Sequence, residues 1–192
     1  MNVRAFAGLL LAAFACGCAH PRPRSMPPRP RGWIEVSGGI ADLQSPRNDV
    51  VGDALVLGLG GGLDFLRGAQ DLGFELGVVA SEHALDPDYV DFGEDDYDVN
   101  VFRFHGGARA TTELGALPFT VYVRGGWFFR SEFDESNNGL GEDGWGTYVG
   151  GGLEYIVEPD IRFGPFVTFQ RGAEDGLEEW LFGFSARFYV DE

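Results

Sequence analysis

The densest group of side chains that could do chemistry is a run of eight carboxylates between Glu82 and Asp98. Carboxylate oxygens are the ligands that Ca²⁺ and Mg²⁺ prefer, so this run is a candidate divalent-cation site. Its spacing is not that of an EF-hand, because no glycine stands at the sixth position counted from Asp86. The plainer interpretation is a solvated acidic loop, and we expect neither a resident metal nor a cofactor. The candidate ligands are Asp86, Asp88, Asp91, Glu94, Asp95 and Asp96.

Ser81, Glu82 and His83 are the residue types of a hydrolase relay. Neighbouring residues of a strand point to opposite faces, so these three side chains do not simply line up. His105 lies between Arg103 and Arg109 in the chain and is expected to point inward into a polar network. We therefore expect a protein that is not an enzyme.

A third group consists of ionic side chains that stand at alternate positions of otherwise apolar or glycine-rich segments. It holds four acids and six arginines, which is close to neutral. The opposite face of the same segments carries no Arg, Asp or Glu. Buried charges are costly unless they pair, so the balance predicts a charge network inside a narrow barrel. Its members are Glu35, Asp64, Glu75, Arg103, Arg109, Arg124, Arg130, Glu154, Arg162 and Arg187.

Eight segments carry this two-residue alternation, which predicts eight strands. The composition agrees, because 30 glycines disfavour helix interiors and 17 phenylalanines favour strands. The predicted strands span residues 33–41, 54–66, 72–81, 99–111, 119–130, 145–157, 161–170 and 180–190.

The connections between these strands alternate in length. The short ones lie near 67–70, 112–118 and 158–160, and the long ones span 42–53, 82–98, 131–144 and 171–179. Outer-membrane barrels have short periplasmic turns and longer outer loops, and an even strand count puts both ends on one side. The tryptophans at 127, 145 and 180 would then lie near the outer rim, as interfacial aromatic residues do.

With this pattern, residues 32–192 resemble the OmpA/OmpX-like family of small outer-membrane barrels. The resemblance implies an all-β fold, an eight-stranded antiparallel up-and-down transmembrane β-barrel, located in the bacterial outer membrane with both termini in the periplasm. The implied partners are outer-membrane lipid and the barrel assembly machinery. Eight strands leave hardly any room for a channel. We expect a monomer with a structural or surface-interaction role and acidic extracellular loops.

One alternative stays open at this point, a lipid-anchored periplasmic barrel of lipocalin type that binds a small apolar ligand. In that barrel the apolar faces would point inward and the charged faces would meet water. Gly32 and Trp33, at the start of the first strand, resemble the lipocalin opening.

The start of the chain predicts export. Residues 1–18 have the features of a signal peptide, with Arg4 before an apolar run over 5–15 that is too short to span a bilayer as a helix. The run ends in a lipoprotein-like sequence with Cys18 (or Cys16) as the acylated residue, and plain cleavage after Ala15 is the alternative. Residues 19–31, rich in Pro and Arg, form a linker.

Two further classes of site are disfavoured by composition. The cysteines at 16 and 18 are the only two, so no disulfide or thiol site is expected in the body. The net charge of −16, with no lysine, would repel the phosphates of nucleic acids.

Overall fold

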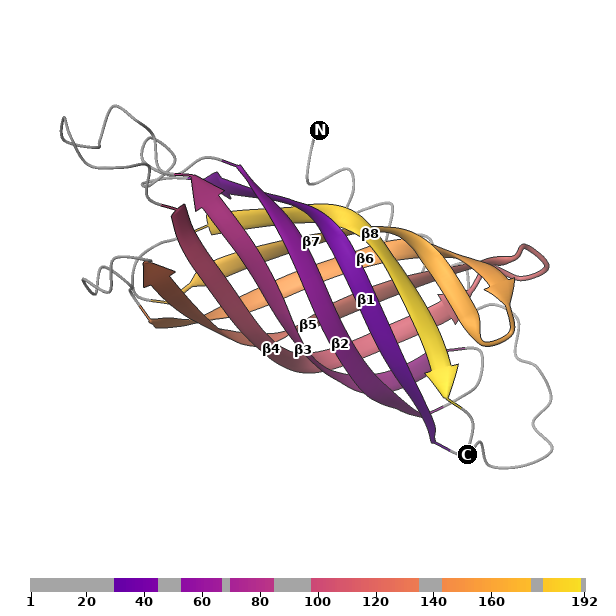
Figure 1. The fold of residues 1–192 in the computed structure, drawn as a ribbon. Coiled ribbons are helices and arrows are strands. Elements are labelled where there is room, and N and C mark those ends of the chain that lie inside the picture. The colour runs from indigo at the N-terminus through magenta and orange to yellow at the C-terminus, as the bar shows by residue number, and fades with distance from the viewer. Residues whose placement is uncertain are drawn as a thin grey trace, which may run out of the picture.

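The computed structural model describes residues 30–44, 53–66, 70–84, 98–134, 143–173 and 178–190. Eight strands form a closed barrel in which each strand pairs antiparallel with its neighbours in the chain, and the first pairs with the last (Figure 1). The predicted fold class, an eight-stranded antiparallel up-and-down barrel, is confirmed. The strands are β1 (Arg31–Gln44), β2 (Ala54–Leu66), β3 (Gln70–Ala84), β4 (Asp98–Glu113), β5 (Phe119–Asp134), β6 (Gly144–Glu158), β7 (Ile161–Gly172) and β8 (Glu178–Val190).

All eight predicted segments lie within these strands, and 54–66 has the predicted bounds. Most of the others run further than predicted, for example β5, which continues past residue 130 to Asp134. The added ends are mostly polar, so the hydrophobic alternation on which the prediction rests is weak there. They remain strands because a paired neighbour satisfies their backbone hydrogen bonds regardless of side-chain type.

The two ends of the barrel differ. Gly32 pairs with Val190, so the first strand begins where the last one ends, and the short turns 114–118 and 159–160 lie at this same end. We call it the turn end. The other, the loop end, is where the connections 45–53, 85–97, 135–143 and 173–177 join the strands. The predicted cation ligands from Asp86 to Asp96 and the predicted segments 1–18 and 19–31 lie outside the described residues, apart from residues 30 and 31.

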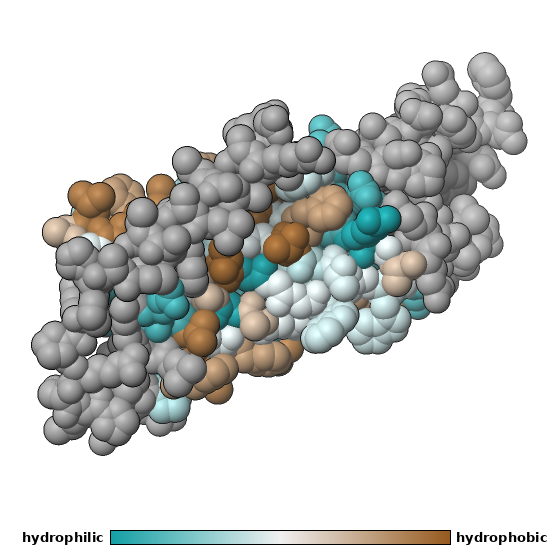
Figure 2. Space-filling model, turned by 180° about the vertical axis from the view of Figure 1, so that it is seen from behind, coloured by the Kyte–Doolittle hydropathy of each residue, from teal (hydrophilic) through white to brown (hydrophobic). Residues whose placement is uncertain are grey.

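The outer wall is apolar. Large hydrophobic side chains such as Leu57, Phe104 and Trp145 are largely exposed there. Figure 2 shows brown, hydrophobic side chains on this wall, on the face turned away from the viewer in Figure 1. The buried side chains are those at the alternate positions, which point into the barrel. The packed interior is therefore the lumen.

Several large side chains of the lumen lie directly opposite a glycine on the neighbouring strand. A Cβ atom added to Gly62 would lie 2.5 Å from the Trp33 ring, so only glycine leaves room for that ring. The pairs are Trp33 with Gly62, His105 with Gly77, Tyr122 with Gly152 and Phe128 with Gly146. Such aromatic–glycine pairs fill the space that glycine leaves and help to fix the pairing register.

Candidate functional site: the charged lumen

A cluster of three arginines and three glutamates occupies the middle of the lumen. Each member comes from a different strand, and β2 and β7 are the two strands that contribute none. Five of the six residues are buried, and Arg124 is largely so. We call this the central cluster. Its members are Glu35, Glu75, Arg109, Arg124, Glu154 and Arg187.

Arg109 is the centre of the cluster. Its Nη1 lies 3.1 Å from Glu35 Oε2 and its Nη2 lies 2.9 Å from Glu154 Oε1. The guanidinium carbon lies 3.4 Å from the centroid of the Tyr122 ring, close enough for a cation–π contact. Arg187 completes the group, because its Nη2 lies 2.8 Å from a carboxylate oxygen of both Glu35 and Glu154. Each of these two carboxylates is thus shared between arginines.

The other two members are held less tightly by ion pairs and more by neutral groups. Arg124 Nη2 donates to the Thr168 hydroxyl at 2.8 Å, and its Nη1 lies 3.5 Å from Glu35. Glu75 accepts a hydrogen bond of 2.8 Å from the Tyr148 hydroxyl and lies 3.7 Å from Arg109. With three charges of each sign, the cluster is formally neutral.

Three pairs of arginines face one another directly across neighbouring strands. They are Arg103 with Arg130, Arg109 with Arg124, and Arg162 with Arg187. Like charges placed directly opposite on a sheet destabilise it. The compensating carboxylates come from other strands, as Glu35 of β1 does for Arg109 and Arg124 of β4 and β5. Arg130 is the exception, because it pairs with Glu132 of its own strand. The lumen charges therefore link strands across the barrel as well as along its wall.

A second cluster lies at the loop end. The guanidinium of Arg103 donates to both carboxylate oxygens of Glu179, with 2.7 Å between Nε and Oε2. It also donates to Ser81 Oγ at 2.7 Å, and this hydroxyl lies 2.9 Å from His83 Nε2. All four residues are buried. A separate ion pair of 2.7 Å joins Arg130 to Glu132.

The hydrolase relay considered from the sequence is not assembled. Ser81 and His83 stand two positions apart on β3 and share the inner face, whereas Glu82 is exposed on the outer wall. The carboxylate that reaches this group is Glu179, and it contacts Arg103. Ser81 and His83 are both buried, so their contact is an internal hydrogen bond of the lumen.

Two arginines stack on one tyrosine ring at the turn end. Arg31 and Arg162 both lie over the ring of Tyr189, with guanidinium carbons 4.4 Å and 4.7 Å from its centroid. Arg31 also forms an ion pair with Asp160 in the β6–β7 turn. Further in, the Trp33 indole N–H donates to Asp64 at 3.2 Å.

The structure places all ten residues of the predicted charge network in the lumen. It adds two carboxylates that the sequence prediction assigned to long connections, Glu132 and Glu179. With these two, the charge network comprises six carboxylates and six arginines. The missed signal is the alternation itself, which places Glu132 two residues after the inward Arg130. Glu179 likewise stands two residues before the inward Leu181.

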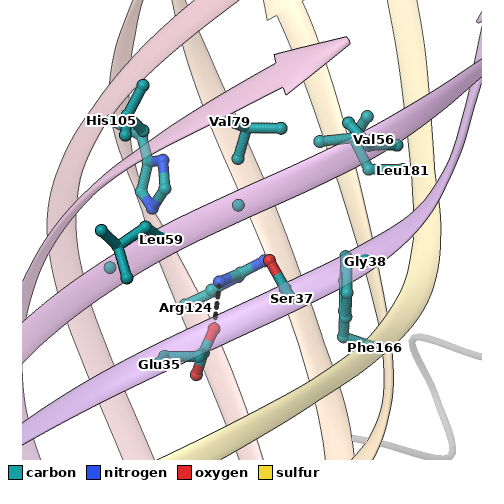
Figure 3. A pocket seen from close by; sticks show the side chains of 13 residues that line it. Glu35, Ser37, Gly38, Val56, Leu59, Val79, His105, Arg124, Phe166 and Leu181 are labelled. Atoms are coloured by element: carbon teal, nitrogen blue, oxygen red, sulfur yellow. Dashed lines mark hydrogen bonds and ion pairs between the residues drawn. The ribbon is translucent and has the colours of Figure 1, made fainter.

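One small cavity opens beside the central cluster. Figure 3 shows His105, Arg124, Glu35 and Ser37 around it, with the aliphatic side chain of Leu59 nearby. Its volume of about 30 Å³ is enough for one or two water molecules. Pockets for organic ligands are at least about ten times larger. The charged faces point inward and the apolar faces outward, which is the reverse of the arrangement that a lipocalin-type ligand barrel requires.

Two other kinds of feature are absent from the described part of the chain. No group of three or more His, Cys, Asp or Glu side chains is placed to hold a metal ion there. No helix among the described residues is long and apolar enough to cross a membrane.

Comparison with known proteins gives a fold likeness. No family model and no curated protein sequence matches this chain. Neisserial surface protein A is similar with a TM-score of 0.56 and 13% identity, over 82% of this chain and 96% of that one. Ail, the attachment invasion locus protein of Yersinia pestis, solved with the heparin analogue sucrose octasulfate, has a TM-score of 0.53 and 14% identity. That match covers 84% of this chain and all of the other. At such identities the likeness shows the fold, an eight-stranded barrel of the kind found in bacterial outer membranes.

Proposed function

We propose that this chain is an exported bacterial protein whose barrel spans the outer membrane and serves a structural or surface-interaction role. In this proposal the turn end faces the periplasm and the long, acidic connections face outward. The barrel stands as a monomer in outer-membrane lipid after insertion by the barrel assembly machinery.

The observation that carries the proposal is the polarity of the barrel. Its outer wall exposes large apolar side chains on every strand, while arginines and carboxylates fill the lumen. A soluble protein rarely exposes such a large contiguous apolar surface. A closed barrel suits the hydrocarbon layer because it has no unpaired sheet edge.

The filled lumen supports a role other than that of a channel. Ionic side chains occupy the middle and both ends of the lumen. An ion passing along the axis would have to displace paired guanidinium and carboxylate groups, at a cost of several kcal/mol for each buried pair broken. The interior therefore supports a stabilising role for these charges, with interactions made by the outer surface.

The surface role is supported by the two similar structures, which are described as a surface protein and an attachment protein. The ligand solved with Ail is a polyanion. This chain carries a net charge of −16, with eight carboxylates between Glu82 and Asp98, so a polyanion is a poor fit. A cationic partner, or divalent cations held at the acidic run, agrees better with this charge.

The N-terminal segment completes the proposal. Residues 1–18 would direct export, with Cys18 or Cys16 as the acylated residue or cleavage after Ala15. The linker 19–31 would then connect an anchor on the periplasmic side to β1, which begins at the turn end.

Tryptophan fluorescence tests insertion, because the chain holds one tryptophan inside the lumen and others outside. Trp33 is 4% exposed in the lumen and Trp127 is 69% exposed on the outer wall. Single-tryptophan variants of the full chain would be refolded into vesicles whose lipids carry brominated acyl chains. We expect strong quenching of Trp127 and little of Trp33. Equal, weak quenching of both would refute membrane insertion.

A further inference from the structure

The barrel closes where β1 meets β8, and no turn holds these two strands in register. Figure 1 shows them side by side, β1 in indigo and β8 in yellow. They pair from Gly32 with Val190 to Gln44 with Glu178, although they lie at opposite ends of the described chain. In a hairpin the turn fixes the register, so this seam needs another device.

Alternation of polar and apolar residues cannot supply that device alone. A slip of one residue would turn every apolar side chain of a strand into the lumen, which excludes odd slips. A slip of two residues keeps each side chain on its proper face. At the seam, the hydrophobic pattern therefore allows several even registers.

The first contact that distinguishes these registers is the ion pair of Glu35 and Arg187. The two residues stand directly opposite each other, and Arg187 Nη2 lies 2.8 Å from Glu35 Oε2. The same carboxylate reaches Arg109 on the opposite wall at 3.1 Å. A two-residue slip moves one strand along the other by about 6–7 Å, which breaks a contact of this length. Both groups are buried, so breaking the pair is costly.

The second contact is between two glycines. Gly39 stands opposite Gly183, and a Cβ on Gly39 would lie 2.0 Å from the carbonyl oxygen of Phe182. A Cβ on Gly183 would lie 2.2 Å from the carbonyl oxygen of Gly38. The strands can approach this closely only when glycine stands on both sides. A two-residue slip would bring Ser185 or Leu181 opposite Gly39, and the side chain would prevent that approach.

We propose that these two contacts, Glu35–Arg187 and Gly39–Gly183, form a register lock that selects the way in which the barrel closes. One contact acts by charge and the other by shape, and both lie on the inner face of the seam. The lock is a property of the closed barrel, so it does not depend on the proposed membrane location or surface role.

Disulfide cross-linking can read the register directly, because the body of the chain has no cysteine. The full chain would carry C16S and C18S, together with one cysteine pair on the outer face of the seam. Val36 and Ala186 are opposite each other, and V36C/A186C reports the native register. V36C/F184C and V36C/F188C report the two slipped registers. Opposed Cα atoms fall within disulfide reach, whereas residues offset by two stand about 7–8 Å apart.

With the lock intact, we expect oxidation after refolding to join the native pair and neither slipped pair. Glu35→Gln removes the charge contact, and Gly39→Ala removes the shape contact without changing any charge. In either variant we expect roughly half of the native cross-link to be lost, with a matching gain at a slipped pair. Glu75→Gln is the matched control, because Glu75 is an equally buried carboxylate away from the seam. It should keep the native cross-link.

The cross-linked fraction would be measured over all molecules, folded and unfolded. A variant that folds poorly would then still give a result. If both lock variants retain the native cross-link alone, the proposal is wrong. If they lose it without any gain at a slipped pair, the two contacts stabilise the barrel without selecting its register, and the proposal is wrong in that case also.

Discussion

Arg103 and Glu179 form a two-point ion pair inside the loop end of the lumen, although 76 positions separate them in the chain. The guanidinium comes from β4, and the carboxylate comes from the second residue of β8. Neither group is accessible to solvent. Planar, bidentate pairs of this kind are among the strongest polar contacts in proteins.

Removing one partner of this pair leaves the other charge buried alone. We predict that Glu179→Gln lowers the free energy of unfolding by about 3–5 kcal/mol, the usual cost of breaking a buried ion pair. Denaturant unfolding of the refolded barrel, followed by tryptophan fluorescence, would measure it. Glu178→Gln is the control, because the neighbouring carboxylate is partly exposed and its pair with Arg171 lies at the surface. That variant should cost about 1 kcal/mol or less. Equal losses of unfolding free energy in both variants would contradict a stabilising role for the buried Arg103–Glu179 pair.

Two carboxylates of the central cluster differ in how closely arginines hold them. Glu154 contacts two arginines at 2.9 Å and 2.8 Å, whereas Glu75 is held by Tyr148 and lies 3.7 Å from Arg109. We therefore predict that Glu154→Leu and Glu75→Leu both lower the unfolding temperature in detergent, and that Glu154→Leu lowers it more. Glu158→Leu serves as the control, because Glu158 is exposed and lies on the same strand as Glu154. An unchanged unfolding temperature in both lumen variants would mean that these charges do not stabilise the barrel.

The sequence was sufficient to predict the strand count, the closed topology and the inner face for the ten residues of the predicted charge network, because a strand reports its two faces through a period of two. It was not sufficient to predict which charges pair. The carboxylate of Glu35 contacts Arg109, Arg124 and Arg187, residues whose proximity depends on the stagger of the closed barrel. At the strand ends both faces are largely polar, so the hydrophobic contrast between them is lost, and for that reason Glu132 and Glu179 were assigned to connections. Their two-residue spacing from the inward Arg130 and Leu181 is the signal that remains.

The glycine opposite Trp33 gives a prediction about shape. A Cβ on Gly62 would lie 2.2 Å from the carbonyl oxygen of Phe74 and 2.5 Å from the Trp33 ring. Gly62→Ala should therefore lower the free energy of unfolding by about 1–3 kcal/mol, as overpacking usually does. Gly144→Ala is the matched control, since a Cβ there would meet no atom within 4 Å. The fluorescence of Trp33 should also change in the first variant, because its ring must move. A Gly62→Ala barrel as stable as the Gly144→Ala barrel would show that the ring does not need the glycine.

Arginine substitutions at two exposed leucines can distinguish a lipid-facing outer wall from a solvent-exposed one. Leu59 is 56% exposed in the middle of β2, and Leu117 is 60% exposed in the turn 114–118. Both are exposed leucines, so in a water-soluble barrel Arg at either position should be nearly neutral. If hydrocarbon surrounds the wall, Leu59→Arg places a charge in the bilayer and should cost about 2–4 kcal/mol near the midplane. Leu117→Arg places the same charge beyond the strands, in water, and should cost little. Refolding each variant into vesicles and measuring the folded fraction against denaturant gives the difference. A large loss confined to Leu59→Arg supports a barrel that crosses the membrane, whereas small losses in both variants would contradict a hydrocarbon-facing wall.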